Sequence, residues 1–143
     1  SAEESLFEQV DSRTRLLTIS SIQFASGFRL NIEKIGQFCH QRNLLLCVDA
    51  IQSIGALEFD VQACFADLAM ADGHKWMLGP EGLGVFYTSP RARDLLAVTQ
   101  FGWHMIENPN DYANRPWEIA AEQAPCAVSN ARMGMAPAKW PPK

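Results

Sequence analysis

A run of apolar residues that ends on a single carboxylate constrains this fold more than any other part of the sequence. Residues 44–48 read Leu-Leu-Leu-Cys-Val, and Asp49 follows them directly. A strand that is apolar at every position is typical of a parallel sheet that is covered on both faces. We therefore expect residues 44–48 to form an inner strand, with Asp49 at its carboxyl end.

The segment before this run supplies the rest of a strand–helix–strand unit. Residues 15–22 are apolar and partly β-branched, which predicts a buried strand. Asn31 can cap a helix, and the apolar face of that helix would consist of Ile32, Ile35, Phe38 and Cys39. Two parallel strands joined by a helix form a right-handed βαβ unit.

Further elements are expected on either side of this unit. They are the end of an amphipathic helix at 3–10, one short helix and a loop within 51–65, and strands at 68–71 and 84–88. A last helix, capped by Ser89, is expected to begin at Pro90 and to end at about Val98. This order of elements predicts the α/β class, with a mixed, mostly parallel sheet between helices.

Composition argues against several kinds of partner. The net charge of the 143 residues is −4 at pH 7, and the Lys and Arg side chains are scattered, so we expect no nucleic acid partner. No apolar run approaches the roughly 20 residues that span a bilayer, so we expect no membrane partner. The four cysteines form no C-x-x-C pair and lack tight spacing with the three histidines. This pattern favours a reducing, cytoplasmic compartment and predicts neither a disulfide framework nor a metal site.

Two strand ends carry residues that can do chemistry. Ligands of open α/β sheets bind at the carboxyl ends of the strands. Asp49 and Gln52 follow one strand, while His74 and Lys75 follow the next. An aspartate can keep a pyridinium nitrogen protonated, and a lysine that faces it can form a Schiff base with an aldehyde cofactor. We therefore expect these strand ends to meet in one crevice suited to pyridoxal-phosphate chemistry.

Each of these residues also has a purely structural interpretation. Asp49 and Gln52 could cap a helix, and Lys75 could lie solvated in a turn. His74 could simply pack beside Trp76. The glycines of the segment 79–84 do not indicate a dinucleotide site, because their spacing is wrong and they precede a strand rather than a helix.

Three motifs in this order resemble the class V aminotransferase superfamily of pyridoxal-phosphate enzymes. They are VDAIQSIGA at 48–56, DLAMADGHKW at 67–76 and GPEGLG at 79–84. That superfamily has fold type I and includes cysteine desulfurases and isopenicillin-N-epimerase-like proteins. The resemblance extends over about 13–101. It implies that 1–100 are the central part of a cofactor-binding large domain. Residues 101–143 show no sustained period and are interrupted by prolines, which predicts a loop or linker with a poorly ordered tail.

The resemblance implies a role for each residue of the two strand ends. Lys75 resembles the lysine that forms the Schiff base and then shuttles protons. Asp49 resembles the acid that pairs with the pyridine nitrogen, and Gln52 resembles the residue that hydrogen-bonds the phenolic oxygen of the ring. His74 resembles the histidine that helps to bind the cofactor phosphate.

One residue departs from the desulfurase pattern. Desulfurases commonly have a serine that contacts the phosphate where this chain has Asp72, and a carboxylate would repel that group. The departure favours the epimerase-like and aminotransferase branches, with the desulfurase branch as the alternative. A non-catalytic, truncated relative that serves as an interaction module is the second alternative.

The resemblance also implies what surrounds this part of the enzyme. The substrate would be an amino acid and the full-length protein would be a homodimer. The family's phosphate-binding turn and the substrate-binding arginine of its small domain have no counterpart in the sequence. We therefore expect no turnover from these 143 residues alone.

Overall fold

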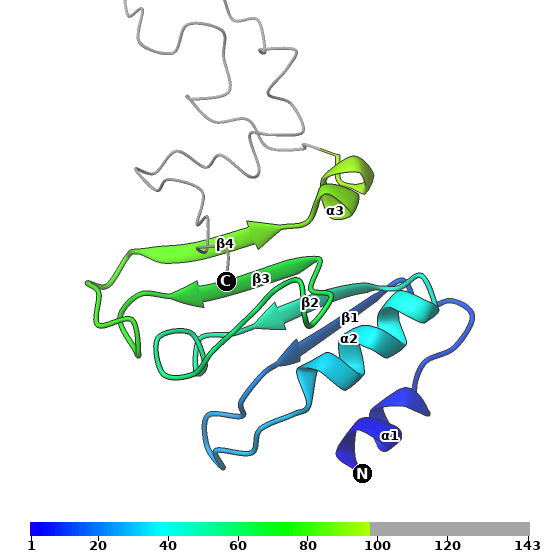
Figure 1. Ribbon diagram of the computed structural model, residues 1–143, viewed down its shortest axis with the longest axis horizontal. Helices are drawn as coiled ribbons and strands as arrows, with labels where there is room; N and C mark the ends of the chain where they lie inside the picture. Colours follow the sequence, from blue (N-terminus) through cyan, green and yellow to red (C-terminus); the bar gives the residue numbers. More distant parts are fainter. Residues whose placement is uncertain (98–143) are drawn as a thin grey trace, which may run out of the picture. The chain divides into compact units, whose positions relative to one another are not determined.

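The computed structural model describes residues 1–97 (Figure 1). Its elements, in chain order, are α1 (Ala2–Phe7), β1 (Leu16–Ser20), α2 (Ile32–Gln41), β2 (Leu45–Asp49), β3 (Leu68–Asp72), β4 (Gly84–Thr88) and α3 (Pro90–Leu95). The chain divides into two units, Ser1–Ser89 and Pro90–Lys143. In the second unit the described residues comprise α3 and the two residues after it. No helix within residues 1–97 is both long enough and apolar enough to cross a bilayer.

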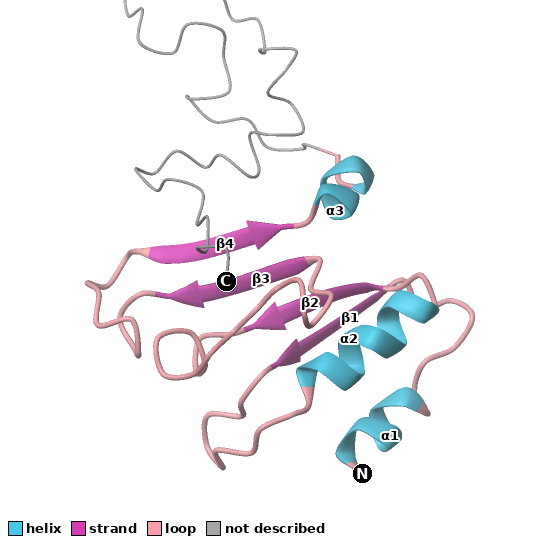
Figure 2. Ribbon diagram, viewed as in Figure 1, coloured by secondary structure: helices cyan, strands magenta, loops and turns pink. Residues whose placement is uncertain are grey.

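The four strands form one sheet in the order β1-β2-β3-β4. β1, β2 and β3 are parallel, and β4 runs antiparallel to β3 (Figure 2). The register pairs Ser20 with Asp49 and Asp49 with Met70. The carboxyl ends of the three parallel strands therefore lie at one edge of the sheet, as the strand–helix–strand pattern predicts.

The helices α1 and α2 pack beside the sheet through one apolar core. The Asn31 side chain accepts a hydrogen bond from the Lys34 N–H (2.9 Å) and caps α2 at the residue that the sequence predicts. Ile35 of α2 is fully buried in the same core cluster as Leu46 and Val48 of β2. The rings of Phe7 and Phe38 stack with their centroids 3.9 Å apart, which joins α1 to α2.

The segment 51–65 forms successive turns instead of the short helix that we expect from sequence. The Ala50 carbonyl accepts hydrogen bonds from the N–H groups of Ser53 and Ile54, and the Ser53 carbonyl then accepts from Leu57. Gly55 lies between these turns with φ of +94°, a conformation outside the helical region that glycine adopts without steric cost. That conformation keeps the turns from continuing as a helix.

The ends of two helices also differ from the expected bounds. The first helix is Ala2–Phe7 rather than 3–10. The helix that begins at Pro90 ends at Leu95, short of the expected end near Val98, a residue outside the described part of the chain. The boundary expected at residue 100 also lies outside the described residues and stays a prediction.

A buried carboxylate joins three of the strands at the edge opposite Asp49. Asp67 is 6% exposed. Its Oδ2 accepts a hydrogen bond from the Leu46 N–H (3.0 Å), and its Oδ1 accepts one from the Ser89 hydroxyl (2.8 Å). Asp67 therefore connects β2 and β3 to the residue that follows β4, and its hydrogen bonds offset the cost of its burial.

Candidate functional site

Asp49 ends β2 as a half-buried carboxylate that neighbouring donors orient. The Ser20 hydroxyl donates a hydrogen bond to its Oδ2 (3.3 Å), and the Ile51 N–H donates one to its Oδ1 (3.1 Å). An ionised carboxylate can only accept hydrogen bonds. The two donors therefore orient the carboxylate at the end of β2, where it can also accept a pyridinium N–H.

A second set of hydrogen bonds holds the backbone after Asp49. The Asp49 carbonyl accepts from the Ser21 N–H (2.9 Å) and from the Ser21 hydroxyl (3.2 Å). The hydroxyls of Ser21 and Ser53 hydrogen-bond each other, and both serines are buried. These contacts fix the turn that carries Gln52 against the residue after β1.

The turn after β2 contacts the loop that carries Lys75. The indole Nε1–H of Trp76 donates a hydrogen bond to the side-chain Oε1 of Gln52 (3.0 Å). A Cβ added to Gly55 would overlap the Trp76 carbonyl oxygen and would lie 2.8 Å from the Met77 nitrogen. The two segments are thus in backbone contact, and only a glycine fits at residue 55.

The Lys75 loop is closed by its own backbone. The Gly79 N–H donates to the Gly73 carbonyl (2.8 Å), and the Leu78 N–H donates to the Lys75 carbonyl (3.1 Å). Lys75 is half-buried and His74 is exposed. Neither side chain has a hydrogen bond or ion pair with another residue of the described part. The Lys75 amine is thus available within this loop.

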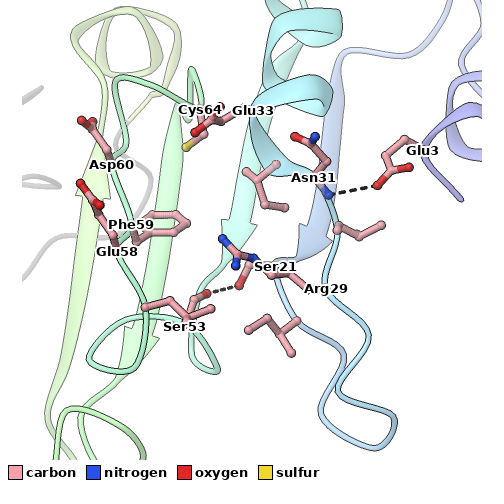
Figure 3. A pocket seen from close by; sticks show the side chains of 14 residues that line it. Glu3, Ser21, Arg29, Asn31, Glu33, Ser53, Glu58, Phe59, Asp60 and Cys64 are labelled. Carbon is pink, nitrogen blue, oxygen red and sulfur yellow. Dashed lines mark hydrogen bonds between the residues drawn. The ribbon is translucent and has the colours of Figure 1, made fainter. Parts of the chain in front are cut away.

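A cavity of about 410 Å³ lies elsewhere, between the start of α2, the segment 21–30 and the segment 57–60 (Figure 3). None of the four predicted site residues lines it. Its charged lining comprises Arg29 and the carboxylates of Glu3, Glu33, Glu58 and Asp60. Such a lining repels an anionic phosphate, so this cavity does not suit the cofactor that the sequence predicts.

One lining residue of this cavity has a strongly shifted pKa. The Asn31 N–H donates a hydrogen bond to the Glu3 carboxylate (3.0 Å). This bond is the main cause that lowers the pKa of Glu3 from 4.5 to about 2. Glu3 thereby joins α1 to the start of α2 and stays ionised over most of the pH range.

The sequence of this chain matches the model of one protein family. The model described as aminotransferase class-V matches residues 2–125, which is most of the chain. This chain belongs to the class V aminotransferase family. The resemblance that the three motifs carry is thereby confirmed.

Two kinds of known enzyme are similar to the chain in sequence. It is 45% identical over 95 residues to a probable cysteine desulfurase of Methanothermobacter thermautotrophicus, covering 66% of this chain and 24% of that protein. It is 32% identical over 106 residues to the isopenicillin N epimerase of Amycolatopsis lactamdurans, covering 72% and 27% respectively. The chain therefore spans about a quarter of the length of these relatives. Similarity does not favour the epimerase-like branch over the desulfurase branch.

Solved structures of cysteine desulfurases share the fold. An apo cysteine desulfurase from Thermococcus onnurineus NA1 has 30% identity and a TM-score of 0.62, covering 66% of this chain and 24% of that one. The cysteine desulfurase CsdA from Escherichia coli has 24% identity and a TM-score of 0.67, covering 74% and 26% respectively. The second likeness concerns the fold alone. The predicted fold class, a mixed and mostly parallel sheet with helices as in fold type I, is confirmed.

The structure brings the turn of Asp49 and Gln52 into contact with the Lys75 loop. The exposed His74 side chain has no hydrogen bond or ion pair with another described residue. Sequence reasoning missed Ser20, which orients Asp49, and the hydrogen bond of Trp76. The Ser20 contact had a usable signal, because neighbouring parallel strands end at the same edge and Ser20 ends the strand before Asp49. The chemical roles of the four predicted residues stay predictions.

Proposed function

We propose that this chain is the cofactor-binding core of a pyridoxal-phosphate enzyme that acts on an amino acid through a Schiff base at Lys75. Pyridoxal phosphate, when bound, supplies an aldehyde for a lysine amine and a ring that withdraws electrons. One observation carries the proposal: the turn with the oriented Asp49 and Gln52 is hydrogen-bonded to the loop that holds an unpaired Lys75.

The residues present fit this cofactor in their chemistry. The Asp49 carboxylate, held by the Ser20 hydroxyl and the Ile51 N–H, can accept the pyridinium N–H. The Gln52 amide has its Nε2 free to donate to the phenolic oxygen, because its Oε1 faces Trp76.

The two residues of the loop would act on the reacting atoms and on the phosphate. The Lys75 amine would bind the aldehyde and, once displaced by the amino group of the substrate, would move a proton at the substrate Cα. The exposed imidazole of His74 would donate a hydrogen bond to the phosphate.

The reaction is proposed within the epimerase-like and aminotransferase branches because of Asp72. This carboxylate is exposed at the end of β3, three residues before Lys75. The 45% identity to a probable cysteine desulfurase favours desulfuration as the second candidate. Formation of alanine from cysteine, with sulfide released when a thiol reductant such as dithiothreitol is added, would support the second candidate. Racemised product or an oxo acid would support the first.

The resemblance to class V aminotransferases also bears on the oligomeric state of the full-length protein, and the cysteines bear on its compartment. We propose a homodimer for the full-length protein, which light scattering tests. We propose the cytoplasm as its compartment. The buried thiols of Cys39, Cys47 and Cys64, which form no disulfide among the described residues, agree with a reducing environment.

Absorbance of the full-length protein with added cofactor tests the main proposal. We expect a band in the violet–blue region that is lost in Lys75→Ala and kept in Lys34→Ala. Lys34 is the matched control, because its amine already pairs with the Glu4 carboxylate at 3.2 Å. A band that survives Lys75→Ala would refute the assignment.

A further inference from the structure

We propose that Trp76 is a positioning residue that fixes which end of the Gln52 side-chain amide faces the cofactor. The inference rests on the proposed function. It concerns a residue whose side chain we do not expect to touch the reacting atoms.

The chemistry of the two side chains decides the orientation. An indole nitrogen can only donate a hydrogen bond, whereas an amide side chain carries both an acceptor oxygen and a donor NH₂ group. The Trp76 Nε1 lies 3.0 Å from the Gln52 Oε1. The opposite orientation would place two donors against each other. The Nε2 of Gln52 therefore remains as the group that can donate to another acceptor.

The backbone makes this contact a fixed feature of the site. The turn after β2 approaches the backbone of Trp76 and Met77 so closely that residue 55 must be a glycine. The closed loop between Gly73 and Gly79 restrains the Trp76 backbone as well. Trp76 directly follows Lys75, so a single residue connects the lysine to the amide that would hydrogen-bond the ring oxygen.

Without its hydrogen bond to Trp76, the Gln52 amide would bind the phenolic oxygen of the cofactor ring less well. Without the indole donor, the Gln52 amide can rotate and present its Oε1, and two acceptors facing each other repel. Loss of one hydrogen bond to a charged oxygen lowers affinity by about tenfold. We expect Trp76→Phe, which keeps an aromatic ring and removes the N–H, to weaken cofactor binding by about that factor.

A double-mutant cycle on the full-length protein tests the inference. Cofactor dissociation constants are measured for the wild type, Trp76→Phe, Gln52→Ala and the double variant. If the indole acts through the amide, Trp76→Phe has no further effect once Gln52 is alanine. Leu78→Ala is the matched control, because Leu78 belongs to the same loop and is 90% exposed; its dissociation constant should equal that of the wild type.

A second measurement needs no cofactor. In protein with ¹⁵N-labelled tryptophan, the indole resonance of Trp76 is identified by its loss in Trp76→Phe. We expect this resonance to shift in Gln52→Ala and to stay in place in Leu78→Ala.

Two results would overturn the inference. The first is an indole resonance of Trp76 that does not shift in Gln52→Ala. The second is a change in the cofactor dissociation constant on Trp76→Phe that is the same in the wild type and in Gln52→Ala, which would indicate that Trp76 contributes packing alone. If the wild-type protein binds no cofactor at all, the proposed function fails, and the role of Trp76 toward the cofactor fails with it.

Discussion

Removal of the Asp67 carboxylate should destabilise the sheet on which the site is built. In Asp67→Ala the Leu46 N–H and the Ser89 hydroxyl both lose their acceptor. Leu46 is fully buried, and a buried N–H without an acceptor costs about 1–3 kcal/mol. The lost hydroxyl contact adds to this cost, while relief of the carboxylate's desolvation offsets part of it. The expected loss is about 2–4 kcal/mol of unfolding free energy.

Urea denaturation of the cofactor-free protein measures this loss. The denaturation midpoint should fall in Asp67→Ala while the slope m stays constant. Asp67→Asn keeps one acceptor oxygen, so it should lose about half as much free energy as Asp67→Ala. Asp72→Ala is the control, because Asp72 is an exposed aspartate at the other end of β3, the strand that Asp67 directly precedes, and its effect should lie within about 0.5 kcal/mol. Equal effects of Asp67→Ala and Asp72→Ala would refute the structural role of this carboxylate.

Four other perturbations have defined outcomes. Ser20→Ala should weaken cofactor binding by about threefold to tenfold, measured by equilibrium dialysis, because Asp49 loses one donor. Gly36→Ala should lower the thermal midpoint, because a Cβ there would overlap the Cys64 carbonyl oxygen. The lowered pKa of Glu3 stabilises the fold above pH 4.5, and this stabilisation is lost as the pH falls from 4.5 to about 2. In Glu3→Gln, chemical denaturation should therefore give a smaller loss of unfolding free energy across that window. Burial raises the pKa of the Cys47 thiol, with the Asp49 charge adding to the rise and a Thr18 hydrogen bond opposing it. Alkylation mapped by mass spectrometry at pH 8 should therefore leave Cys47 unlabelled until the protein unfolds.

The parts of the fold that sequence predicts well are those that burial determines. A five-residue apolar run followed by Asp49 is typical of an inner parallel strand, and β2 covers Leu45–Asp49. The segment 51–65 was predicted wrongly as partly helical. Its apolar residues suit a helix or packed turns equally, and the choice depends on the close approach of Gly55 to the Trp76 backbone.

The candidate site also has a part that the sequence predicts and a part that depends on how its loops fold. The general rule that ligands bind at strand ends was enough to place Asp49 and Lys75 at one edge of the sheet. The hydrogen bond between Gln52 and Trp76 joins two loops that are 24 residues apart in sequence. Neither composition nor periodicity indicates such a contact, since it depends on how the two turns fold back on each other.

Location of the covalent cofactor adduct tests the assignment of Lys75 most directly. The full-length protein is incubated with pyridoxal phosphate and reduced with borohydride, and its peptides are mapped by mass spectrometry. The reduced cofactor should be attached to Lys75, with Lys34 unmodified. An adduct on another lysine would contradict the assignment, and the absence of any adduct would favour a non-catalytic member of the family.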